Sequence, residues 1–404
     1  MKDLLFLCHR IPYPPKKGDK IRSYHLLQFL ARRYRIHLGA FIDNPEDWQH
    51  TTFLDEMIGG KSCYVGLNPR WSKIGSLSGF LTGEALTFPY YRNQQMAQWV
   101  DQILADHDID QIVVFSAALA QYVLHKPARL IIDFVDVDSD KWRQYAMEQG
   151  GLNGWVFGRE ARKLQAKERA LAQAADASFL VSEAEARLFR TIAPDAADKI
   201  HFWENGVDQD YFSPDRTYEN PYTAQQIPLV FTGAMDYRPN VDAVVWFARD
   251  IFPIIRQAVE KAHFFIVGGG PTAEVLALGN RPGITVTGRV ADVRPYIAHG
   301  RVSIAPMRLA RGVQNKVLEA LAMARPVVAT SQAMEGIRLC PGLEQWITDD
   351  EANFAGKVLA ILADQSQPVT KQQMVQLGSI GRRCVIEHYN WQTNLQRVLS
   401  VMKG

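Results

Sequence analysis

The chain has 404 residues, of which 47% are apolar and 22% are charged, and its 45 Lys and Arg residues nearly balance its 43 Asp and Glu residues. This composition is typical of a globular protein with a sizeable core, and it excludes a mainly disordered chain. A formal net charge of +2 gives no support to nucleic acid as a partner. At about 100–200 residues per domain, the length predicts two domains.

The four cysteines are Cys8, Cys63, Cys340 and Cys384. Their spacing fits neither a metal site nor a disulfide framework, so we expect a reducing compartment. The longest apolar run, near 112–124, is too short to span about 30 Å of hydrocarbon, and the N-terminus is typical of a strand rather than of a signal peptide. These features predict a cytoplasmic protein and leave open an association with the inner face of the cell membrane.

The first half of the chain predicts a parallel sheet covered by helices. Short apolar runs typical of buried strands occur at 4–8, 36–42, 112–115, 130–135, 177–181 and 200–203. Apolar residues at helical spacing over 21–30 lie between the first two runs, and a strand–helix–strand order of this kind requires a parallel sheet. A charged helix is expected over 158–175, whereas the aromatic-rich segment 71–91 is less regular.

The second half predicts another domain of the same class. The apolar pattern stops near 211–227, which indicates the linker. Further strands are expected at 229–231, 264–267, 284–287, 302–305 and 327–329, with helices between them, for example at 242–255 and 313–323. Two doubly wound α/β domains bind ligands beyond the carboxyl ends of their strands, so we expect a site in the cleft between the domains.

The most informative segment covers residues 303–330. After a buried strand it has a loop with Gly312, then a helix expected from Val313, with Asn315 and Lys316 in its first turn. Amides at a helix start and the helix dipole attract anions, and Lys316 adds a full positive charge. This arrangement suits a diphosphate.

Glu319 follows Lys316 by three positions, on the same helix face. Its carboxylate could accept hydrogen bonds from a ribose. An exposed ion pair between Lys316 and Glu319, worth about 0.3–0.5 kcal/mol, is the competing interpretation. The spacing alone leaves both open.

Several motifs between residues 200 and 340 occur in the order found in one known family. They lie at 205–214, 231–234, 266–271, 286–290, 319–329 and 335–337. The motif Glu-Ala-Leu-Ala-Met-Ala-Arg-Pro-Val-Val-Ala at 319–329 resembles the donor-site motif of the family-4 retaining glycosyltransferases, which have the GT-B fold. The resemblance implies two Rossmann-like α/β domains facing a cleft. Residues 1–210 would bind the acceptor and residues 225–385 the nucleotide sugar, with a helix at 386–404 crossing back to the N-terminal domain.

The segments 133–142, 231–240 and 314–319 resemble a subgroup, the sugar transferases associated with the PEP-CTERM/exosortase system. This resemblance implies a role in exopolysaccharide synthesis. One position departs from the wider family, in which two glutamates lie eight positions apart. The first corresponds here to Arg311, which cannot accept hydrogen bonds from sugar hydroxyls but could hold the diphosphate. The identity of the donor sugar is therefore not carried over.

Other candidates for nucleotide binding follow the strands of the second domain. They are Gly233, Gly268, Gly269, Arg289, Val290 and Arg308. A side chain at Gly233 would block close approach of a ligand, whereas Gly268 and Gly269 could simply end a strand. Arg289 would neutralise phosphate charge, and the backbone of Val290 would lie near the base. Arg308 is the weaker candidate, because solvated loop arginines are common.

In the first domain the resemblance places the loop with Gly18 against the donor sugar and the acceptor. Asp136 and Asp138 directly follow the strand at 130–135, where a carboxylate could take or orient the proton of the acceptor hydroxyl. They could instead cap the helix that starts near Ser139. His9 is interpreted as an ordinary histidine at a strand end.

A short basic cluster, Arg32, Arg33 and Arg35, together with the aromatics of 71–91, is consistent with a peripheral membrane contact. The cluster is equally typical of a helix C-terminus, where cations are favoured by the dipole.

We therefore expect a retaining, metal-independent glycosyltransferase without a cofactor. Its donor substrate would be a nucleoside diphosphate sugar of UDP or GDP, and its acceptor a glycan or a polyprenyl-linked glycan. Two alternatives stay open: a nucleotide-sugar epimerase or hydrolase of the same architecture, and a catalytically degenerate partner of a polysaccharide assembly complex, which Arg311 would explain.

Overall fold

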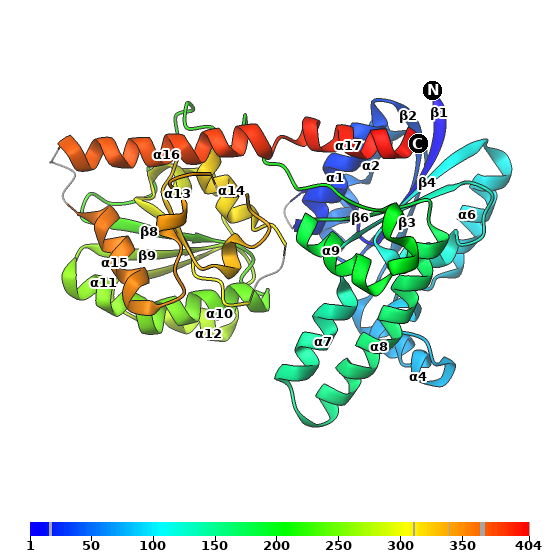
Figure 1. Ribbon diagram of the computed structural model, residues 1–404, viewed down its shortest axis with the longest axis horizontal. Coiled ribbons are helices and arrows are strands. Elements are labelled where there is room, and N and C mark those ends of the chain that lie inside the picture. The colour runs from blue at the N-terminus through cyan, green and yellow to red at the C-terminus, as the bar shows by residue number, and fades with distance from the viewer. Residues whose placement is uncertain (16–17, 310–311, 339, 364–367, 404) are drawn as a thin grey trace. The chain divides into compact units, whose positions relative to one another are not determined.

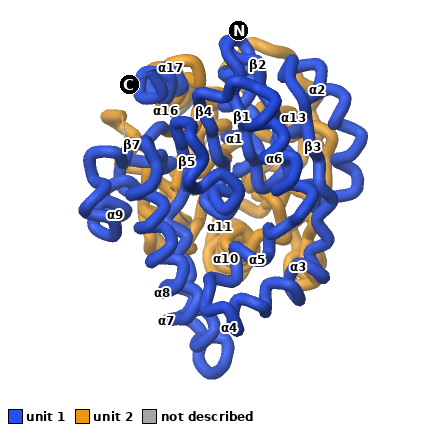
Figure 2. The backbone as a smooth tube through the Cα atoms, turned by 90° about the vertical axis from the view of Figure 1, so that its right-hand side faces the viewer, with its two compact units in different colours: residues 1–203, 395–404 blue, residues 204–394 orange. Residues whose placement is uncertain are grey.

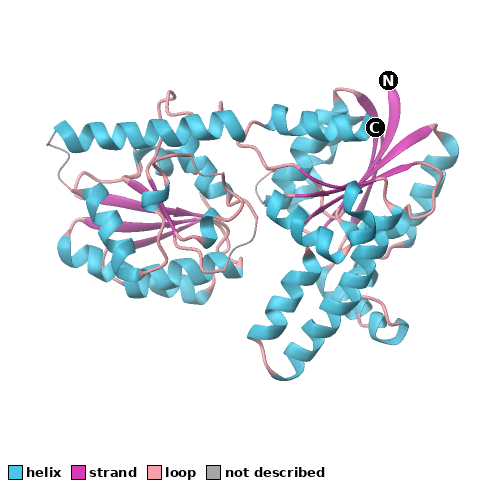
Figure 3. Cartoon of the chain, in the orientation of Figure 1, coloured by secondary structure: helices cyan, strands magenta, loops and turns pink. Residues whose placement is uncertain are grey.

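The computed structural model describes residues 1–15, 18–309, 312–338, 340–363 and 368–403 (Figure 1). The chain divides into two compact units, unit 1 with residues 1–203 and 395–404 and unit 2 with residues 204–394 (Figure 2). Each unit is a parallel sheet flanked by helices (Figure 3), as the sequence predicts. Among the described residues, no helix is both long and apolar enough to cross a bilayer.

The seven-stranded sheet of unit 1 has the order β3-β2-β1-β4-β5-β6-β7, with parallel neighbours throughout. Its strands are β1 (Lys2–Cys8), β2 (Tyr34–Ile42), β3 (Gly59–Gly66), β4 (Ile109–Phe115), β5 (Arg129–Val135), β6 (Ala177–Leu180) and β7 (Ile200–Phe202). All of these strands except β3 are predicted from the sequence. This edge strand alternates exposed and covered residues and contains three glycines, so it has no apolar run.

The α-helices of unit 1 include a long hairpin. They are α1 (Gly18–Ala31), α2 (Thr51–Ile58), α3 (Pro69–Ser76), α4 (Ser78–Thr82), α5 (Thr87–Tyr90), α6 (Gln94–Asp106), α7 (Asp138–Glu148), α8 (Gly151–Ala174) and α9 (Glu183–Ile192). The less regular segment 71–91 thus consists largely of three short helices. The hairpin of α7 and α8 extends away from the sheet, with α4 beside it (Figure 1).

Unit 2 has a five-stranded parallel sheet in the order β10-β9-β8-β11-β12. Its strands are β8 (Ile227–Thr232), β9 (Ala262–Val267), β10 (Ile284–Gly288), β11 (Val302–Ala305) and β12 (Val327–Ala329). Its α-helices are α10 (Arg238–Trp246), α11 (Phe252–Ala258), α12 (Ala273–Leu278), α13 (Arg294–His299), α14 (Asn315–Ala322), α15 (Glu351–Leu362) and α16 (Pro368–His388). The helix expected over 242–255 is interrupted by a π-helical turn at Phe247–Ile251, between α10 and α11.

The last helix, α17 (Trp391–Lys403), begins in unit 2 and ends in unit 1. In unit 1 the carbonyl oxygens of Val401 and Met402 accept hydrogen bonds from Arg129 Nη2 (2.9 Å) and Gln111 Nε2 (3.0 Å). The end of the chain is therefore a part of the first folding unit.

The cysteine spacing predicts no disulfide, and this prediction was wrong. Cys340 and Cys384 form a disulfide between the segment after β12 and α16, with their Cα atoms 6.0 Å apart. The two residues are 44 positions apart, so the packing of α16, not a spacing motif, brings the thiols together. Cys8 and Cys63 are free and buried.

Candidate functional site

The carboxyl edge of the unit 2 sheet brings together the glycines singled out in the sequence. The backbone amide of Gly233, after β8, donates to Val267 O (3.0 Å), and that of Gly268, after β9, donates to Gly288 O (3.2 Å). Arg289 follows directly after β10. Because neighbouring strands are parallel, the loop after β11 leaves the sheet at the same edge.

A side chain would collide with neighbouring atoms at two of these strand ends, Gly233 and Gly268, and would just touch Arg289 at Gly269. A Cβ atom on Gly268, where φ is +154°, would lie 1.7 Å from Gly233 O. On Gly233 it would lie 2.7 Å from Asn240 Nδ2, and on Gly269 it would lie 3.4 Å from Arg289 Nε. The absence of side chains lets the two strand ends and the side chains of Asn240 and Arg289 approach one another closely.

Lys316 of α14 reaches across the edge toward the loop after β8. Its Nζ donates to Asn240 Oδ1 (2.8 Å) and lies 4.9 Å from the centre of the Phe231 ring. Asn240 is 5% exposed and donates to Ala234 O (2.8 Å), so this amide holds both the loop and the lysine. Among the described residues Lys316 makes no ion pair with Glu319, so the interpretation as a simple exposed pair does not hold.

Burial changes the acid–base properties of both side chains. It lowers the pKa of Lys316 to about 8, although the Glu319 charge acts in the opposite direction. It raises the pKa of Glu319 to about 7, against the opposing effect of Lys316. Such a pair of perturbed groups at a sheet edge that binds ligands in other α/β proteins is typical of a functional site.

The start of α14 offers backbone donors at the same edge. The helix begins at Asn315, two residues after the expected Val313, and the preceding Gln314 provides no side-chain cap. Asn315 Oδ1 is buried and has no hydrogen-bond partner among the described residues. Gly312 has a φ of +62°, which lets the loop turn into the helix. Arg311 lies outside the described residues.

Two of the candidates are engaged elsewhere. Arg308 Nη2 pairs with Asp242 Oδ1 of α10 (2.6 Å), so a carboxylate already balances its charge. The half-buried side chain of Val290 packs against an apolar cluster that includes Val230 and Phe265, which does not affect the predicted contact of its backbone with the base.

The three candidates of unit 1 lie at the carboxyl edge of its sheet or at a helix start. Asp136 directly follows β5, Asp138 is the first residue of α7, and Gly18 is the exposed first residue of α1. Asp138 does not cap α7, because Glu168 Oε1 of α8 accepts from the Ser139 amide (3.1 Å) instead.

A charged network that was not predicted from the sequence lies at this edge. Arg10, after β1, donates to Asp43, after β2 (2.9 Å), and pairs with Asp19 in the first turn of α1. His9 Nε2 lies 3.5 Å from Asp19 Oδ2. Burial alone would raise the pKa of Asp19, but His9 and Arg10 outweigh it and hold that pKa well below its usual range. The sequence contains a signal for this network, because each of these residues lies shortly after a strand or at the start of a helix.

A second missed feature is a buried ion pair in the core of unit 1. Arg22 and Asp133 are 0% and 1% exposed, and Arg22 Nε donates to Asp133 Oδ2 (3.0 Å). Trp203 Nε1 donates to the same oxygen (3.0 Å), and the guanidinium lies 3.5 Å from the centre of the indole ring. Asp133 is therefore a structural residue.

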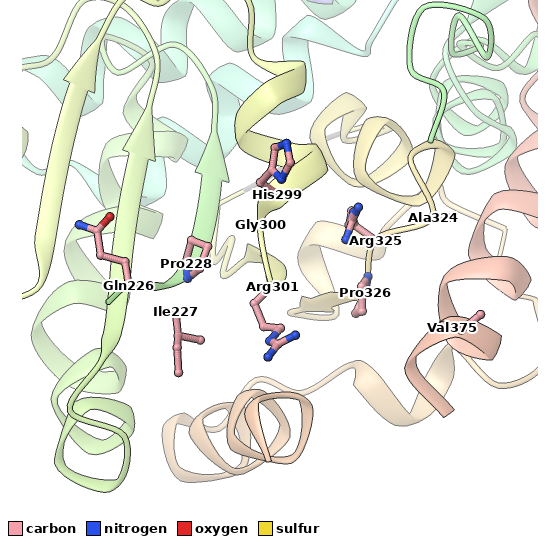
Figure 4. Close-up of a pocket in the computed structure, with 10 residues that line it drawn as sticks. All are labelled: Gln226, Ile227, Pro228, His299, Gly300, Arg301, Ala324, Arg325, Pro326 and Val375. Carbon is pink, nitrogen blue, oxygen red and sulfur yellow. The ribbon is translucent and has the colours of Figure 1, made fainter. Parts of the chain in front are cut away.

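A cavity of about 290 Å³ in unit 2 is separate from the candidate site (Figure 4). It is lined by Gln226, Ile227, Pro228, His299, Gly300, Arg301, Ala324, Arg325, Pro326 and Val375. Most of these residues lie at the beginnings of β8, β11 and β12, the opposite edge of the sheet, and none of them is a predicted site residue.

Comparison with solved structures identifies the fold. Anabaena Alr3699/HepE in complex with UDP and glucose superposes with a TM-score of 0.66 at 14% identity, with all of both chains covered. WaaG, a glycosyltransferase involved in lipopolysaccharide biosynthesis, gives a TM-score of 0.66 at 15% identity over 99% of this chain and 100% of that chain. The protein thus has two Rossmann-like domains, with GT-B glycosyltransferases as its structural neighbours.

Sequence comparison finds similarity to glycosyltransferases in the second unit and over nearly the whole chain. Residues 226–364 match the family model described as "Glycosyl transferases group 1". A Mycobacterium tuberculosis protein named GDP-mannose-dependent alpha-(1-6)-phosphatidylinositol monomannoside mannosyltransferase is 26% identical over 413 residues, covering 97% of this chain and 96% of that protein. The matched domain includes the glycine-lined edge, Lys316 and Glu319.

Proposed function

We propose that the protein is a retaining glycosyltransferase that moves a sugar from a nucleoside diphosphate sugar to a lipid-linked glycan. The observation that carries this proposal is the position of Lys316, held by Asn240 beside the glycine-lined strand ends and the uncapped start of α14. A departing diphosphate gains negative charge, and cations and backbone amides fixed in advance stabilise that charge.

Each group at this edge has a role in the proposal. Lys316, Arg289 and the first amides of α14 hold the diphosphate, so that transfer needs no metal ion. Glu319 accepts hydrogen bonds from the ribose, and the backbone near Val290 lies against the base. In unit 1, Asp136, Asp138 and the Gly18 loop act on the acceptor.

For the donor we propose a sugar of GDP or UDP, and GDP-mannose is the first to test. GDP-mannose is supported by the mycobacterial relative, which is named as a GDP-mannose-dependent mannosyltransferase and aligns with nearly the whole chain. UDP-glucose is second, because Alr3699/HepE, a structural neighbour, was crystallised with it. The relative's acceptor is a lipid-borne glycan, which favours a lipid-linked acceptor here, and the subgroup resemblance favours exopolysaccharide synthesis.

The test is a panel of UDP, GDP, ADP and their sugars, measured by thermal shift and by calorimetry in the presence of EDTA. We expect one nucleotide to stabilise the protein selectively, and its sugar to be transferred with the anomeric configuration retained in the product by NMR. Glu319→Gln should weaken binding of that nucleotide, whereas Lys261→Met, at an exposed lysine before β9, should not. Binding of none of the nucleotides would refute the proposal, and binding without transfer would favour a non-catalytic partner.

A further inference from the structure

The cavity at the amino edge of the unit 2 sheet is lined by two arginines, Arg301 and Arg325 (Figure 4). It is formed mainly by residues at the beginnings of β8, β11 and β12, and Val375 of α16 completes it. Its volume of about 290 Å³ is close to the lower limit of the range of about 300–1,000 Å³ for small-molecule pockets. This size favours a ligand smaller than a nucleotide sugar.

The register of the sheet places the two arginines side by side. Ser303 of β11 pairs with Val327 of β12. Arg301 and Arg325 each precede one of these paired residues by two positions, so they occupy neighbouring positions at the amino edge. The Ser303 amide also donates to Pro326 O (2.9 Å), which extends the pairing toward Arg325. The two side chains therefore line one cavity rather than two separate surfaces.

The turn that carries Arg325 is fixed by packing. After α14, Ala324 adopts the left-handed region with a φ of +53°, and the Arg325 amide donates to Ala320 O (2.9 Å). The helix α16 packs directly against this turn, since a Cβ atom on Gly378 would lie 2.2 Å from Ala324 O. The backbone at Arg325 is thus held in place before any ligand binds.

The side chain of Arg325 has no hydrogen-bond or ion-pair partner in the described part of the chain, and its Nε atom is buried. Burial lowers the pKa of Arg325, and the charge of Arg301 lowers it further, so the two guanidiniums repel each other. Both stay protonated, because arginine does not lose its proton in proteins. A partly buried charge without a partner is unfavourable, and an anion beside it would remove this penalty.

The charge around the cavity is positive. Among the described residues the lining contains no Asp or Glu, and the sequence has none within four positions of any lining residue. Both arginines follow the C-terminus of a helix, α13 or α14, where the dipole favours cations. The two helix ends together carry about one negative charge, whereas the arginines carry two positive charges. The described residues therefore give the cavity an excess of positive charge.

We propose that Arg301 and Arg325 bind the phosphate group of a small ligand in this cavity. A guanidinium presents its N–H groups in a planar fork that matches two oxygens of a phosphate. Two neighbouring forks suit a tetrahedral phosphate, whose oxygens can be shared between them, better than a planar carboxylate, which one fork saturates. The inference goes beyond the proposed function, because the candidate nucleotide site lies at the opposite edge of the sheet.

The test is calorimetry of the full chain with inorganic phosphate and with glucose 6-phosphate, at an ionic strength held constant with chloride. We expect saturable binding that weakens as salt is raised. Arg325→Gln should lower the affinity by about tenfold or more, the loss expected when a charged hydrogen-bond donor is removed. Arg187→Gln removes the same charge at an exposed position of unit 1 and should bind as the unchanged protein does.

A third variant, Arg325→Lys, keeps the charge but not the fork. It should bind more weakly than the unchanged protein and more tightly than Arg325→Gln. Tighter binding of glucose 6-phosphate would show that the cavity holds a phosphate ester, and equal binding of the two probes would show that it recognises the phosphate alone. Circular dichroism and thermal unfolding without ligand show whether each variant is folded.

Lys316→Met separates this cavity from the candidate nucleotide site. It should leave phosphate binding at the cavity unchanged, and Arg325→Gln should leave binding of the preferred nucleoside diphosphate unchanged. The inference is overturned if neither probe binds, if folded Arg325→Gln binds as tightly as Arg187→Gln, or if Lys316→Met abolishes the binding. Phosphate binding through Arg325 in a protein that binds no nucleotide overturns only the proposed function.

Discussion

The replacement Lys316→Met tests the candidate site because it should move folding stability and ligand binding in opposite directions. The fall of the Lys316 pKa from 10.5 to about 8 means that the charged form costs about 3 kcal/mol in the folded protein. Met retains the apolar length beside Phe231 and removes that cost, but it leaves Asn240 Oδ1 without its donor, which costs about 1–3 kcal/mol. The free energy of unfolding should therefore stay the same or rise by up to about 2 kcal/mol.

Nucleotide binding should fall, because a charge-assisted hydrogen bond to a phosphate contributes about 1.5–3 kcal/mol, which corresponds to about 10- to 150-fold in Kd. Urea unfolding and calorimetry with the preferred nucleoside diphosphate measure the two effects, with Lys261→Met as the control. A variant that is clearly less stable and binds the nucleotide normally would show that Lys316 is a structural residue and would refute the reasoning.

The pH dependence of folding stability and of nucleotide affinity provides a second test of the role of Lys316. Above about pH 8 the folded protein loses the Lys316 proton while the unfolded chain keeps it up to about pH 10.5, so the Lys316 contribution to stability rises with pH in this window. Over the same range the affinity for the nucleotide should fall, because the ammonium charge is lost. Lys316→Met should remove both trends, and their persistence in the variant would assign them to other groups.

Three further predictions concern packing. Gly268→Ala should destabilise unit 2 by at least about 2 kcal/mol and weaken nucleotide binding, since its Cβ would lie 1.7 Å from Gly233 O; normal thermal unfolding and binding would contradict this. Asp133→Asn should cost about 3–5 kcal/mol in urea unfolding, because Arg22 stays buried without its counter-charge; a neutral effect would show that the remaining hydrogen bonds suffice. Reduction of the unit 2 disulfide, which links positions 44 apart, should lower stability by up to about 4 kcal/mol; an unchanged melting temperature in reducing buffer would show that packing alone holds the two segments.

The sequence predicts the parts of the fold that depend on neighbours along the chain. Apolar runs identify eleven of the twelve strands in the described part of the chain, and the polar or glycine residue after each run marks the edge that holds Gly233 and Lys316. The sequence does not predict contacts between residues that lie far apart along the chain. Nothing in the local pattern shows that Lys316 is held by Asn240, 76 positions away, or that Arg22 pairs with Asp133, 111 positions away. Arg308 is similar, since its partner Asp242 is reached only through the packed sheet. For this reason the sequence predicts the edge at which the candidate site residues gather, but it does not predict which of their side chains already have partners.

Because the final helix returns to unit 1, this unit is the first to be synthesised but the last to be completed. Gln111 and Arg129 of unit 1 bind the carbonyls of Met402 and Val401, so the ribosome must extend the chain beyond residue 402 before unit 1 has these partners. Most of unit 2 is synthesised after unit 1. The residues that form unit 2 are nevertheless all synthesised before Val401 and Met402, which complete unit 1. A nascent chain stalled just before residue 395 would consequently expose an incomplete amino-terminal half beside a nearly finished carboxyl-terminal one.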